Sequence, residues 1–427
     1  MILKAIVVNI LTFEAKLLVR RKRPTIIAIT GSVGKTSTKD AIYAVLRRHC
    51  AARKSQKSFN SEIGVPLTVL GLSSAWSSPL LWVKNLAEGM LTALFAREYP
   101  KVLVLETGVD RPGDMGVLAG WLKPHIVVLT RLPDVPAHIE YFATPEAVIA
   151  EKMELVQALR PDGVLIYNND DEQIRREIEH VRQASFGYSR YSPSHYTVSG
   201  DTILYDGSTP HGMEFTLTHF DESAPVTVSH SLGVQHAYNF AAATAVGAQF
   251  DIDLESAATA LSEHRPPAGR MRLITGVTGT LIIDDTYNSS PVAAERALLT
   301  LKEIKHTKRK IAVLGDMLEL GQYSVPEHER IGALVPECAD MLITIGVRAR
   351  KFAEGALEHG MSEKVILQYD DVDRAAQELR TLVKTGDVIL VKASQSIRAE
   401  KVVQHLMDRP ELAPELLVRQ DPEWIKR

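Results

Sequence analysis

Residues 30–37 combine glycines, a lysine and hydroxyl side chains in the manner of a phosphate-binding loop. The stretch reads "TGSVGKTS" and follows "TIIAI", an apolar run that predicts a buried strand. Backbone N–H groups at a glycine-rich turn and a helix start attract an anion, lysine adds positive charge, and a hydroxyl suits Mg²⁺. We therefore expect Lys35 at the terminal phosphates of a nucleotide and Thr36 at the metal. The loop residues expected to bind the nucleotide are Gly31, Ser32, Gly34, Lys35, Thr36 and Ser37.

Two further polar residues follow apolar runs that predict parallel strands. Glu106 comes directly after "KVLVL", and His138 follows "HIVVLT" after a short loop. Ligands of parallel sheets bind at the carboxyl ends of the strands, so both side chains are expected near the phosphate loop. A carboxylate is a natural Mg²⁺ ligand, whereas a histidine is less usual and, on sequence alone, is more often structural.

The order of predicted elements indicates an α/β protein with a central domain and a carboxyl-terminal domain. Strands and helices alternate from residue 25, as in a P-loop domain with a parallel sheet, and residues 186–234 read as antiparallel hairpins inserted at its edge. "HRPPAGRMR" marks a boundary near residue 266, and four more apolar runs beyond it predict a Rossmann-like domain. The predicted domains are a helix over 1–24, the central ATP-binding domain over 25–265 and the second domain over 266–427.

Net charge and cysteine usage bear on the partner and the compartment of the protein. The 427-residue chain has a formal net charge of −3, which disfavours nucleic acid as a partner. Cys50 and Cys338 are far apart and match neither a disulfide framework nor a metal site, which favours a reducing, cytoplasmic compartment.

The first 24 residues are apolar with a basic end, "RRKR". Glu14 and Lys16 interrupt the apolar run before it reaches the roughly 20 residues of a membrane span. The spacing predicts an amphipathic helix that packs on its own domain, and the alternative is peripheral contact of residues 1–23 with an anionic membrane.

Several motifs along the chain resemble the Mur ligase family. The loop has the form T-G-x-x-G-K-[ST]-[ST], with Ile29 where the general P-loop pattern has a glycine. The other motifs, in the family's order, are "NSEIGVPLTVL", "VLETGVDRPGD", "AHIEYFATPEAVIAEKMEL", "HAYNFAAATAV", "PAGRM", "DDTYNSSP" and "GDMLELG". The sequence is most similar to the MurF branch over residues 25–405.

This resemblance implies an ATP-dependent, ADP-forming amide ligase of peptidoglycan precursor synthesis. Such an enzyme activates a peptide carboxylate, here of a muramyl peptide, as an acyl phosphate and joins it to an amine such as D-Ala-D-Ala. Each step concentrates negative charge, so catalysis depends on positioning and on cations.

The resemblance also implies roles for individual residues. Glu106 and His138 join Thr36 in holding Mg²⁺, and Lys152 is carbamylated and acts in catalysis together with Lys35. Asn239 lies at the adenine, Asp285 at the ribose and Arg270 at the phosphates. The residues expected at the substrates are Asn60, Tyr287, Asn288, Lys392 and Ser394.

Two departures from the family concern the substrates. Ala393 and Gln395 replace a glycine and an arginine of the late V-K-G-S-R motif, which leaves the amine open. Only the 24-residue helical segment precedes the P-loop domain, so we expect no amino-terminal UDP-binding domain. A partner protein could supply that grip, or the substrate is not UDP-linked, as in folylpolyglutamate and poly-amino-acid ligases. A nucleotide-binding scaffold without ligase activity is the third alternative.

Overall fold

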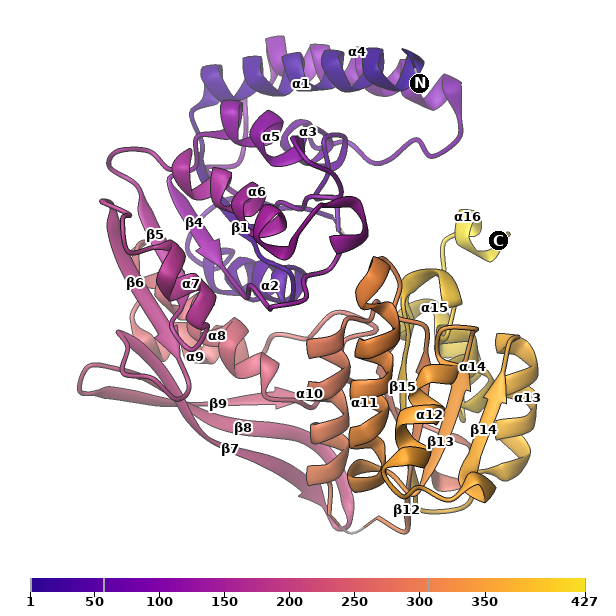
Figure 1. Cartoon of the computed structure of the whole chain (residues 1–427). Coiled ribbons are helices and arrows are strands. Elements are labelled where there is room, and N and C mark those ends of the chain that lie inside the picture. The colour runs from indigo at the N-terminus through magenta and orange to yellow at the C-terminus, as the bar shows by residue number, and fades with distance from the viewer. Residues whose placement is uncertain (1, 57, 306, 427) are drawn as a thin grey trace.

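The computed structural model describes residues 2–56, 58–305 and 307–426, and its strands form two sheets. Figure 1 shows the first sheet with its helices to the upper left and the second sheet with its helices to the lower right. The strands are β1 (Thr25–Thr30), β2 (Ala52–Lys54), β3 (Val102–Glu106), β4 (Ile126–Leu129), β5 (Val164–Asn168), β6 (Ala184–Ser189), β7 (Tyr196–Asp206), β8 (Thr209–His219), β9 (Glu222–Ser229), β10 (Arg272–Thr275), β11 (Leu281–Asp285), β12 (Arg309–Gly315), β13 (Met341–Ile345), β14 (Ile366–Tyr369) and β15 (Asp387–Lys392).

The α-helices lie between these strands and at both ends of the chain. They are α1 (Ile2–Lys22), α2 (Lys35–Leu46), α3 (Gly64–Leu70), α4 (Pro79–Phe95), α5 (Asp114–Leu122), α6 (Pro145–Gln157), α7 (Glu172–Glu177), α8 (Gln235–Ala248), α9 (Leu254–Ser262), α10 (Pro291–Glu303), α11 (Ser324–Cys338), α12 (Arg350–Glu358), α13 (Val372–Leu382), α14 (Glu400–Leu406), α15 (Ala413–Leu416) and α16 (Pro422–Ile425). No described helix is long and apolar enough to cross a membrane.

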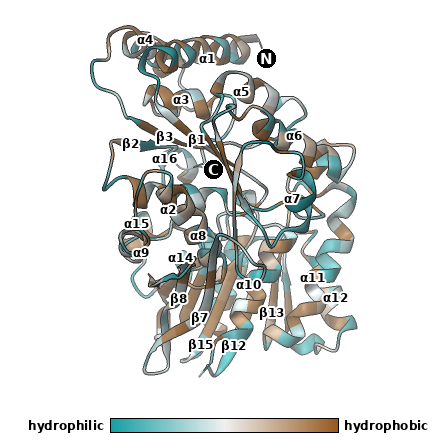
Figure 2. Cartoon of the chain, turned by 90° about the vertical axis from the view of Figure 1, so that its left-hand side faces the viewer, coloured by the Kyte–Doolittle hydropathy of each residue, from teal (hydrophilic) through white to brown (hydrophobic). Residues whose placement is uncertain are grey.

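The first sheet has nine strands in the order β2-β3-β1-β4-β5-β6-β7-β8-β9. Its strands pair in parallel from β2 to β7, and β7, β8 and β9 continue it as antiparallel strands. The central strands are apolar on both faces, because helices cover both sides, and they appear brown in Figure 2. The alternating segments of the sequence therefore form the expected hairpins at the edge of this sheet.

Helices α2, α8 and α9 cover one face of the first sheet. Alanines make up much of α8, and all of its positions from Ala241 to Val246 are buried, so the helix approaches its neighbours closely. On the other face, α5 and α6 pack with residues such as Met115 and Ile149. These helices fix the carboxyl ends of β1, β3 and β4, where the polar residues of the site emerge.

The second sheet has six strands in the order β10-β11-β15-β12-β13-β14, and β10 alone is antiparallel to its neighbour. Helices α10, α11 and α12 pack on one face and α13 and α14 on the other. The expected α/β class, with a mostly parallel sheet in each half, is confirmed.

Helices α1 and α4 lie side by side at the top of the molecule (Figure 1), outside the first sheet. Leu11, Ala15 and Leu18 bury the inner face of α1 in a core shared with α3 and β3. The expected packing of the first helix on its own domain is therefore present.

Candidate active site

The phosphate loop connects β1 to α2, and its two glycines adopt backbone conformations that other residues rarely take. Gly31 has φ +137°, and a Cβ there would lie 2.1 Å from Oγ1 of Thr130. Gly34 has φ +90° and precedes the first residue of α2, Lys35. The Lys35 Nζ donates a hydrogen bond to the Gly31 carbonyl at 2.7 Å. Lysine and helix amino terminus thus face the same space.

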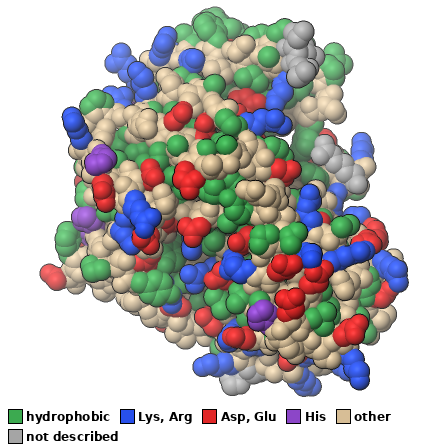
Figure 3. Space-filling view, viewed as in Figure 1, with side chains coloured by type: hydrophobic (Ala, Val, Ile, Leu, Met, Phe, Trp, Pro, Cys, Tyr) green, Lys and Arg blue, Asp and Glu red, His purple; other side chains and the backbone are tan. Residues whose placement is uncertain are grey.

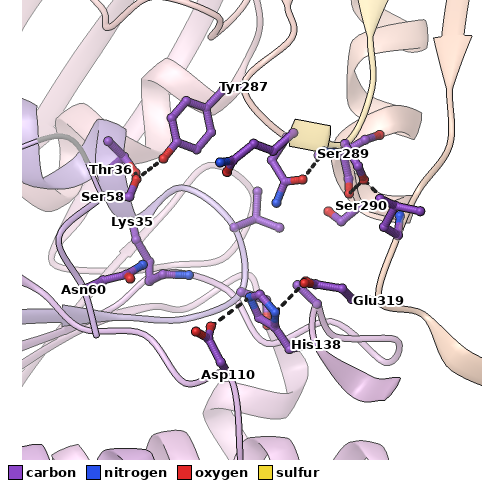
Figure 4. Close-up of a pocket in the computed structure, with 18 of the residues that line it drawn as sticks. Lys35, Thr36, Ser58, Asn60, Asp110, His138, Tyr287, Ser289, Ser290 and Glu319 are labelled. Carbon is purple, nitrogen blue, oxygen red and sulfur yellow. Dashed lines mark hydrogen bonds and ion pairs between the residues drawn. The ribbon is translucent and has the colours of Figure 1, made fainter. Parts of the chain in front are cut away.

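A cavity of about 590 Å³ separates this loop from the second sheet, and Figure 4 shows it in close-up. Eleven of the residues expected in the site line it: Ser32, Gly34, Lys35, Thr36, Asn60, Glu106, His138, Arg270, Tyr287, Asn288 and Ser394. They come from both sheets, as expected for a site between two domains. Burial lowers the pKa of Lys35 from its usual value, and the charge of Glu106 opposes that shift.

Side chains of the second domain reach the phosphate loop directly. Arg270 Nη2 lies 3.5 Å from Thr36 Oγ1, and its guanidinium stacks 4.1 Å above the ring of Tyr287. The Tyr287 hydroxyl is hydrogen-bonded to Ser58, whose Oγ lies 3.4 Å from Thr36 Oγ1 (Figure 4). Arg270 Nε is buried and has no hydrogen-bond partner, so the guanidinium retains a donor for a ligand.

Glu106 ends β3 on the floor of the cavity and is 2% exposed. Asn60 Nδ2 donates to its Oε1 at 3.1 Å. The other oxygen, Oε2, accepts no hydrogen bond and has Lys39 Nζ at 3.8 Å. A buried carboxylate oxygen without a hydrogen bond is costly unless a ligand completes it.

His138 lies between two carboxylates from different parts of the chain (Figure 4). Its Nδ1 is 2.7 Å from Oε2 of Glu319, in the second domain, and its Nε2 is 3.9 Å from Oδ1 of Asp110. This contact lowers the pKa of Glu319. His138 and Glu319 both have left-handed backbones, with φ +68° and +63°. Such conformations persist where the surroundings enforce them, which is common at functional sites.

Lys152 is buried in α6 and lines neither the large cavity nor the smaller one beside it. Burial, followed by the positive charge of Lys35, lowers its pKa to about 7, while Asp110 and Glu151 oppose the shift. Glu151 itself accepts hydrogen bonds from the backbone N–H groups of Gly113 and Met115. Lys152 therefore carries an amine that is partly neutral near pH 7.

The second, smaller cavity, of about 110 Å³, adjoins the loop on the side of α8. Ser37, Asn239, Asp285 and Lys392 line it. Asn239 Oδ1 accepts from Thr38 at 2.9 Å, while its Nδ2 is buried without a hydrogen-bond partner. An amide N–H group without a partner beside a P-loop can donate a hydrogen bond to the base or the ribose of a nucleotide.

Lys392, Ser394 and Asn288 are held by their own domain. Lys392 Nζ donates to Asp285 Oδ2 at 2.6 Å and to the Asn288 carbonyl at 2.9 Å, and the side chain is almost fully buried. Ser394 Oγ accepts from the Leu318 N–H at 2.9 Å. These contacts fix the side chains of Lys392 and Ser394, which line the smaller and the larger cavity respectively.

Sequence reasoning missed several residues that line the cavity. Ser58 and Asp110 contact the phosphate loop or His138, and Asp110 lies inside the quoted motif "VLETGVDRPGD", so a signal for it was present. Trp424, near the carboxyl terminus, lines the cavity from a segment with no chemical motif. Within the described residues, no group of three or more His, Cys, Asp or Glu side chains converges to hold a metal ion unaided.

Comparison with known families agrees with this geometry. The Mur ligase middle domain matches residues 29–79 and 84–247, and the Mur ligase glutamate ligase domain matches residues 269–395. The chain belongs to the Mur ligase family. Membership of the Mur ligases confirms the expected class of enzyme, an ATP-dependent ligase that forms ADP.

Individual relatives extend this result. The UDP-N-acetylmuramoyl-tripeptide–D-alanyl-D-alanine ligase of Bacillus subtilis is 31% identical over 388 residues, which cover 90% of this chain and 76% of that protein. The MurF ligase of Thermotoga maritima, solved in complex with ADP, aligns with a TM-score of 0.76 at 25% identity and covers 95% of this chain and 84% of that one. Folylpolyglutamate synthase of Mycobacterium tuberculosis shares the fold at 15% identity, with a TM-score of 0.67 and coverage of 93% and 95%.

Proposed function

We propose that this protein is a MurF-type ligase that joins the carboxylate of a muramyl peptide to an amine such as D-Ala-D-Ala. The observation that carries the proposal is the cavity itself, where Lys35 and Thr36 of the first domain face Arg270 of the second. Cations from both sides of a cleft suit the transfer of a phosphoryl group. The activity named for the Bacillus subtilis relative supports the same substrates.

In the proposed reaction, an oxygen of the substrate carboxylate attacks the γ-phosphorus of ATP, and the bond from that phosphorus to the β–γ bridging oxygen breaks to release ADP. The amine nitrogen then attacks the carbonyl carbon of the acyl phosphate, the carbon–oxygen bond to phosphate breaks, and the nitrogen loses a proton. Lys35 and Arg270 would neutralise the charge that develops on the transferred group. Domain contacts such as Ser58–Tyr287 would keep water from the acyl phosphate.

The residues present fit a Mg²⁺ ion. Glu106 offers a buried oxygen without a hydrogen bond, and Thr36 offers a hydroxyl at the cavity wall. When bound, Mg²⁺ would supply positive charge at the phosphates. His138 would take part either as a ligand or, given its two carboxylate neighbours, by linking Asp110 to Glu319. In the smaller cavity, Asn239 and Asp285 would contact the adenosine, with Ser37 at the adjoining end of the loop.

Lys152 is proposed to carry a carbamate. Its amine would attack the carbon of CO₂ and lose a proton, which converts a buried cation into an anion near Lys35. A pKa of about 7 supports this step, because the neutral amine is the reactive form. The resulting anion would offset the charge of Lys35 rather than repel it.

The direct test is incubation with ATP, Mg²⁺, UDP-muramyl tripeptide and D-Ala-D-Ala. We expect ADP and phosphate in amounts equal to the peptide product, and release that depends on both the carboxylate and the amine. ADP release that ignores either substrate, or nucleotide binding with no turnover, would overturn the proposal; the latter result would favour a scaffold.

A second candidate keeps the chemistry and changes the substrates. One observation favours it: Ala393 and Gln395 depart from the family motif. In that case the cavity alone, or a partner protein, would hold a carboxylate that is not UDP-linked. A panel of folate, amino-acid and lipid-linked carboxylates with several amines, assayed for ADP release, separates the two candidates. Either reaction uses ATP and, with two free thiols in the chain, suits the cytoplasm.

A further inference from the structure

Helix α4 presents its large apolar side chains to solvent. Leu80, Val83, Leu91, Leu94 and Phe95, here called the α4 stripe, recur at helical spacing and are all exposed, from 46% for Leu94 to 83% for Leu80. Together α1 and α4 hold eight of the seventeen large apolar side chains that are exposed in the described residues. A contiguous patch of this kind on a globular protein marks an interaction surface.

The opposite face of α4 explains why the stripe points outward. Asn85, Gly89 and Ala93 are the buried positions: Gly89 and Ala93 pack toward α1, and Asn85 donates to the Ser73 carbonyl at 2.8 Å. Gly89 is required there, because a Cβ would lie 2.2 Å from the Glu14 carboxylate of α1. The helix therefore buries small or polar residues and exposes large apolar ones, the reverse of the pattern that stabilises an ordinary surface helix.

Basic side chains surround one end of the stripe. Arg21 of α1 donates to the Leu94 and Ala96 carbonyls, and Lys22 donates to the Arg97 carbonyl at 2.7 Å. Arg20 and Arg23 are also exposed at this end. Residues 1–24 and 79–101 together carry nine basic and three acidic residues, in a chain of net charge −3. Figure 3 shows green side chains along the top of the molecule with blue beside them at the upper left.

We propose that the α4 stripe and the basic end of α1 dock the protein on the surface of an anionic lipid bilayer. The apolar side chains would enter the region between headgroups and acyl chains, and the basic residues would contact lipid phosphates. This surface extends the alternative contact of residues 1–23 to a second helix, and α4 contributes six of the eight exposed large apolar side chains of the two helices. The proposal does not depend on the ligase activity.

Shape and charge favour a bilayer over a protein partner. The two helices lie parallel along an outer edge of the molecule (Figure 1), a convex ridge rather than a groove that a partner helix would fill. If a second copy of the chain docked on this surface, the basic clusters of the two copies would lie in the same interface and repel each other. A bilayer with anionic headgroups instead provides an apolar region for the stripe and negative charge for the basic residues.

The test is co-sedimentation of the full chain with vesicles of phosphatidylcholine alone or with about 30% phosphatidylglycerol, a content that gives a clear negative surface potential. We expect binding to the anionic vesicles that weakens as salt rises. Leu91→Glu should reduce the partition coefficient roughly 10- to 100-fold, since it puts a negative charge in place of an apolar side chain that would enter the bilayer. Arg20→Glu combined with Arg97→Glu should reduce it roughly tenfold or more.

Matched controls use residues of the same type elsewhere on the surface. Phe95→Glu lies in the stripe and should weaken binding, whereas Phe220→Glu changes an equally exposed phenylalanine of the first sheet's antiparallel edge and should not. Thermal unfolding of each variant identifies any loss of fold. The proposal is overturned if the chain fails to bind anionic vesicles, binds neutral ones equally, or instead forms a dimer in sedimentation that Leu91→Glu disrupts.

Discussion

The two walls of the cavity differ in how their buried charges are balanced. On the first wall, Glu106 keeps one carboxylate oxygen without a hydrogen bond, and burial lowers the pKa of Lys35 and, behind the wall, of Lys152. On the second wall, Arg270 keeps a donor for a ligand, but the charges behind it form close pairs, Lys392 with Asp285 at 2.6 Å and Arg419 with Glu400 at 2.8 Å. The first wall is thus incomplete without a ligand, whereas the second is supported by ion pairs within the protein.

This difference predicts that substitutions on the two sides of the cavity change different properties, turnover on one side and stability on the other. Side chains of the first wall should affect turnover with little change in stability, because their partners arrive with the substrates. The paired side chains behind the second wall should affect stability, because removing one member of a pair leaves the other buried and uncompensated.

Lys35→Ala tests the first wall most strongly. Turnover should fall by roughly 10³-fold, the cost of losing a charge aimed at the transferred phosphoryl group. The melting temperature should change little, since the side chain gives up one hydrogen bond to Gly31. Lys84→Ala, an exposed lysine of α4, is the control and should leave turnover unchanged. Full activity of Lys35→Ala would contradict the proposal that the first wall takes part in phosphoryl transfer.

Lys152→Ala should reduce turnover by roughly 10²-fold, as for a group that positions charge in the site. The wild-type enzyme should also lose activity in CO₂-free buffer, and added bicarbonate should restore it more fully at pH 8 than at pH 6. The reason is that the amine, with a pKa of about 7, is mostly neutral only above that pH. Carbon NMR with labelled CO₂ should show a carbamate signal that is absent in Lys152→Ala. Activity that ignores CO₂ would contradict the assignment.

Lys392→Met tests the second wall. Breaking the buried pair with Asp285 should lower the free energy of unfolding by about 3–5 kcal/mol, measured by urea denaturation. Glu400→Gln, which weakens the pair with Arg419, is a matched variant away from the proposed substrate sites and should also be destabilised. If Lys392→Met lost turnover at unchanged stability, Lys392 would contact substrate and the contrast between the walls would fail.

Glu14→Met extends the comparison to a buried carboxylate outside the cavity. Both oxygens of Glu14 are buried without hydrogen bonds, and burial raises its pKa from 4.5 to about 7. The protonated form is favoured in the fold, so its contribution to stability is full below pH 4.5 and is lost as pH rises through 7. At pH 8, Glu14→Met should therefore melt a few degrees higher than wild type, and the gap should close near pH 5. Glu88→Met, on the exposed side of α4, should show no such pH dependence.

Local patterns in the sequence predicted the first wall better than the second. The phosphate loop is a single contiguous motif, and Glu106 follows a strand, so the spacing alone brings them to one edge of a sheet. The His138–Glu319 contact joins residues far apart in the chain. Both residues have left-handed backbones, and neither is a glycine, so the sequence gives no signal for this conformation. Similarly, the sequence predicted a place for Lys392 only through the late motif, as a residue at the substrates. Its pairing with Asp285 depends on β11 and β15 being neighbours, which periodicity does not reveal.

The outward stripe of α4 was also beyond sequence reasoning. No motif singles out this segment, and the close approach of α1 at Gly89 decides which side of α4 faces solvent. The spacing of the N-terminal segment, in contrast, predicted a helix that packs on its own domain, and Leu11 and Leu18 bury its inner face.

Trp76 connects the ridge of helices to the catalytic cleft. It lies in the turn before α4, is exposed, and meets the ring of Trp424 edge-on at 6.3 Å, while Trp424 lines the cavity. A molecule held at a bilayer by its ridge would therefore keep its entrance close to the lipid headgroups. If the carboxylate substrate were carried by a lipid, the rate at which it meets the enzyme would depend on its density in the membrane instead of its concentration in bulk solution. Enzyme and substrate would then diffuse toward each other in two dimensions.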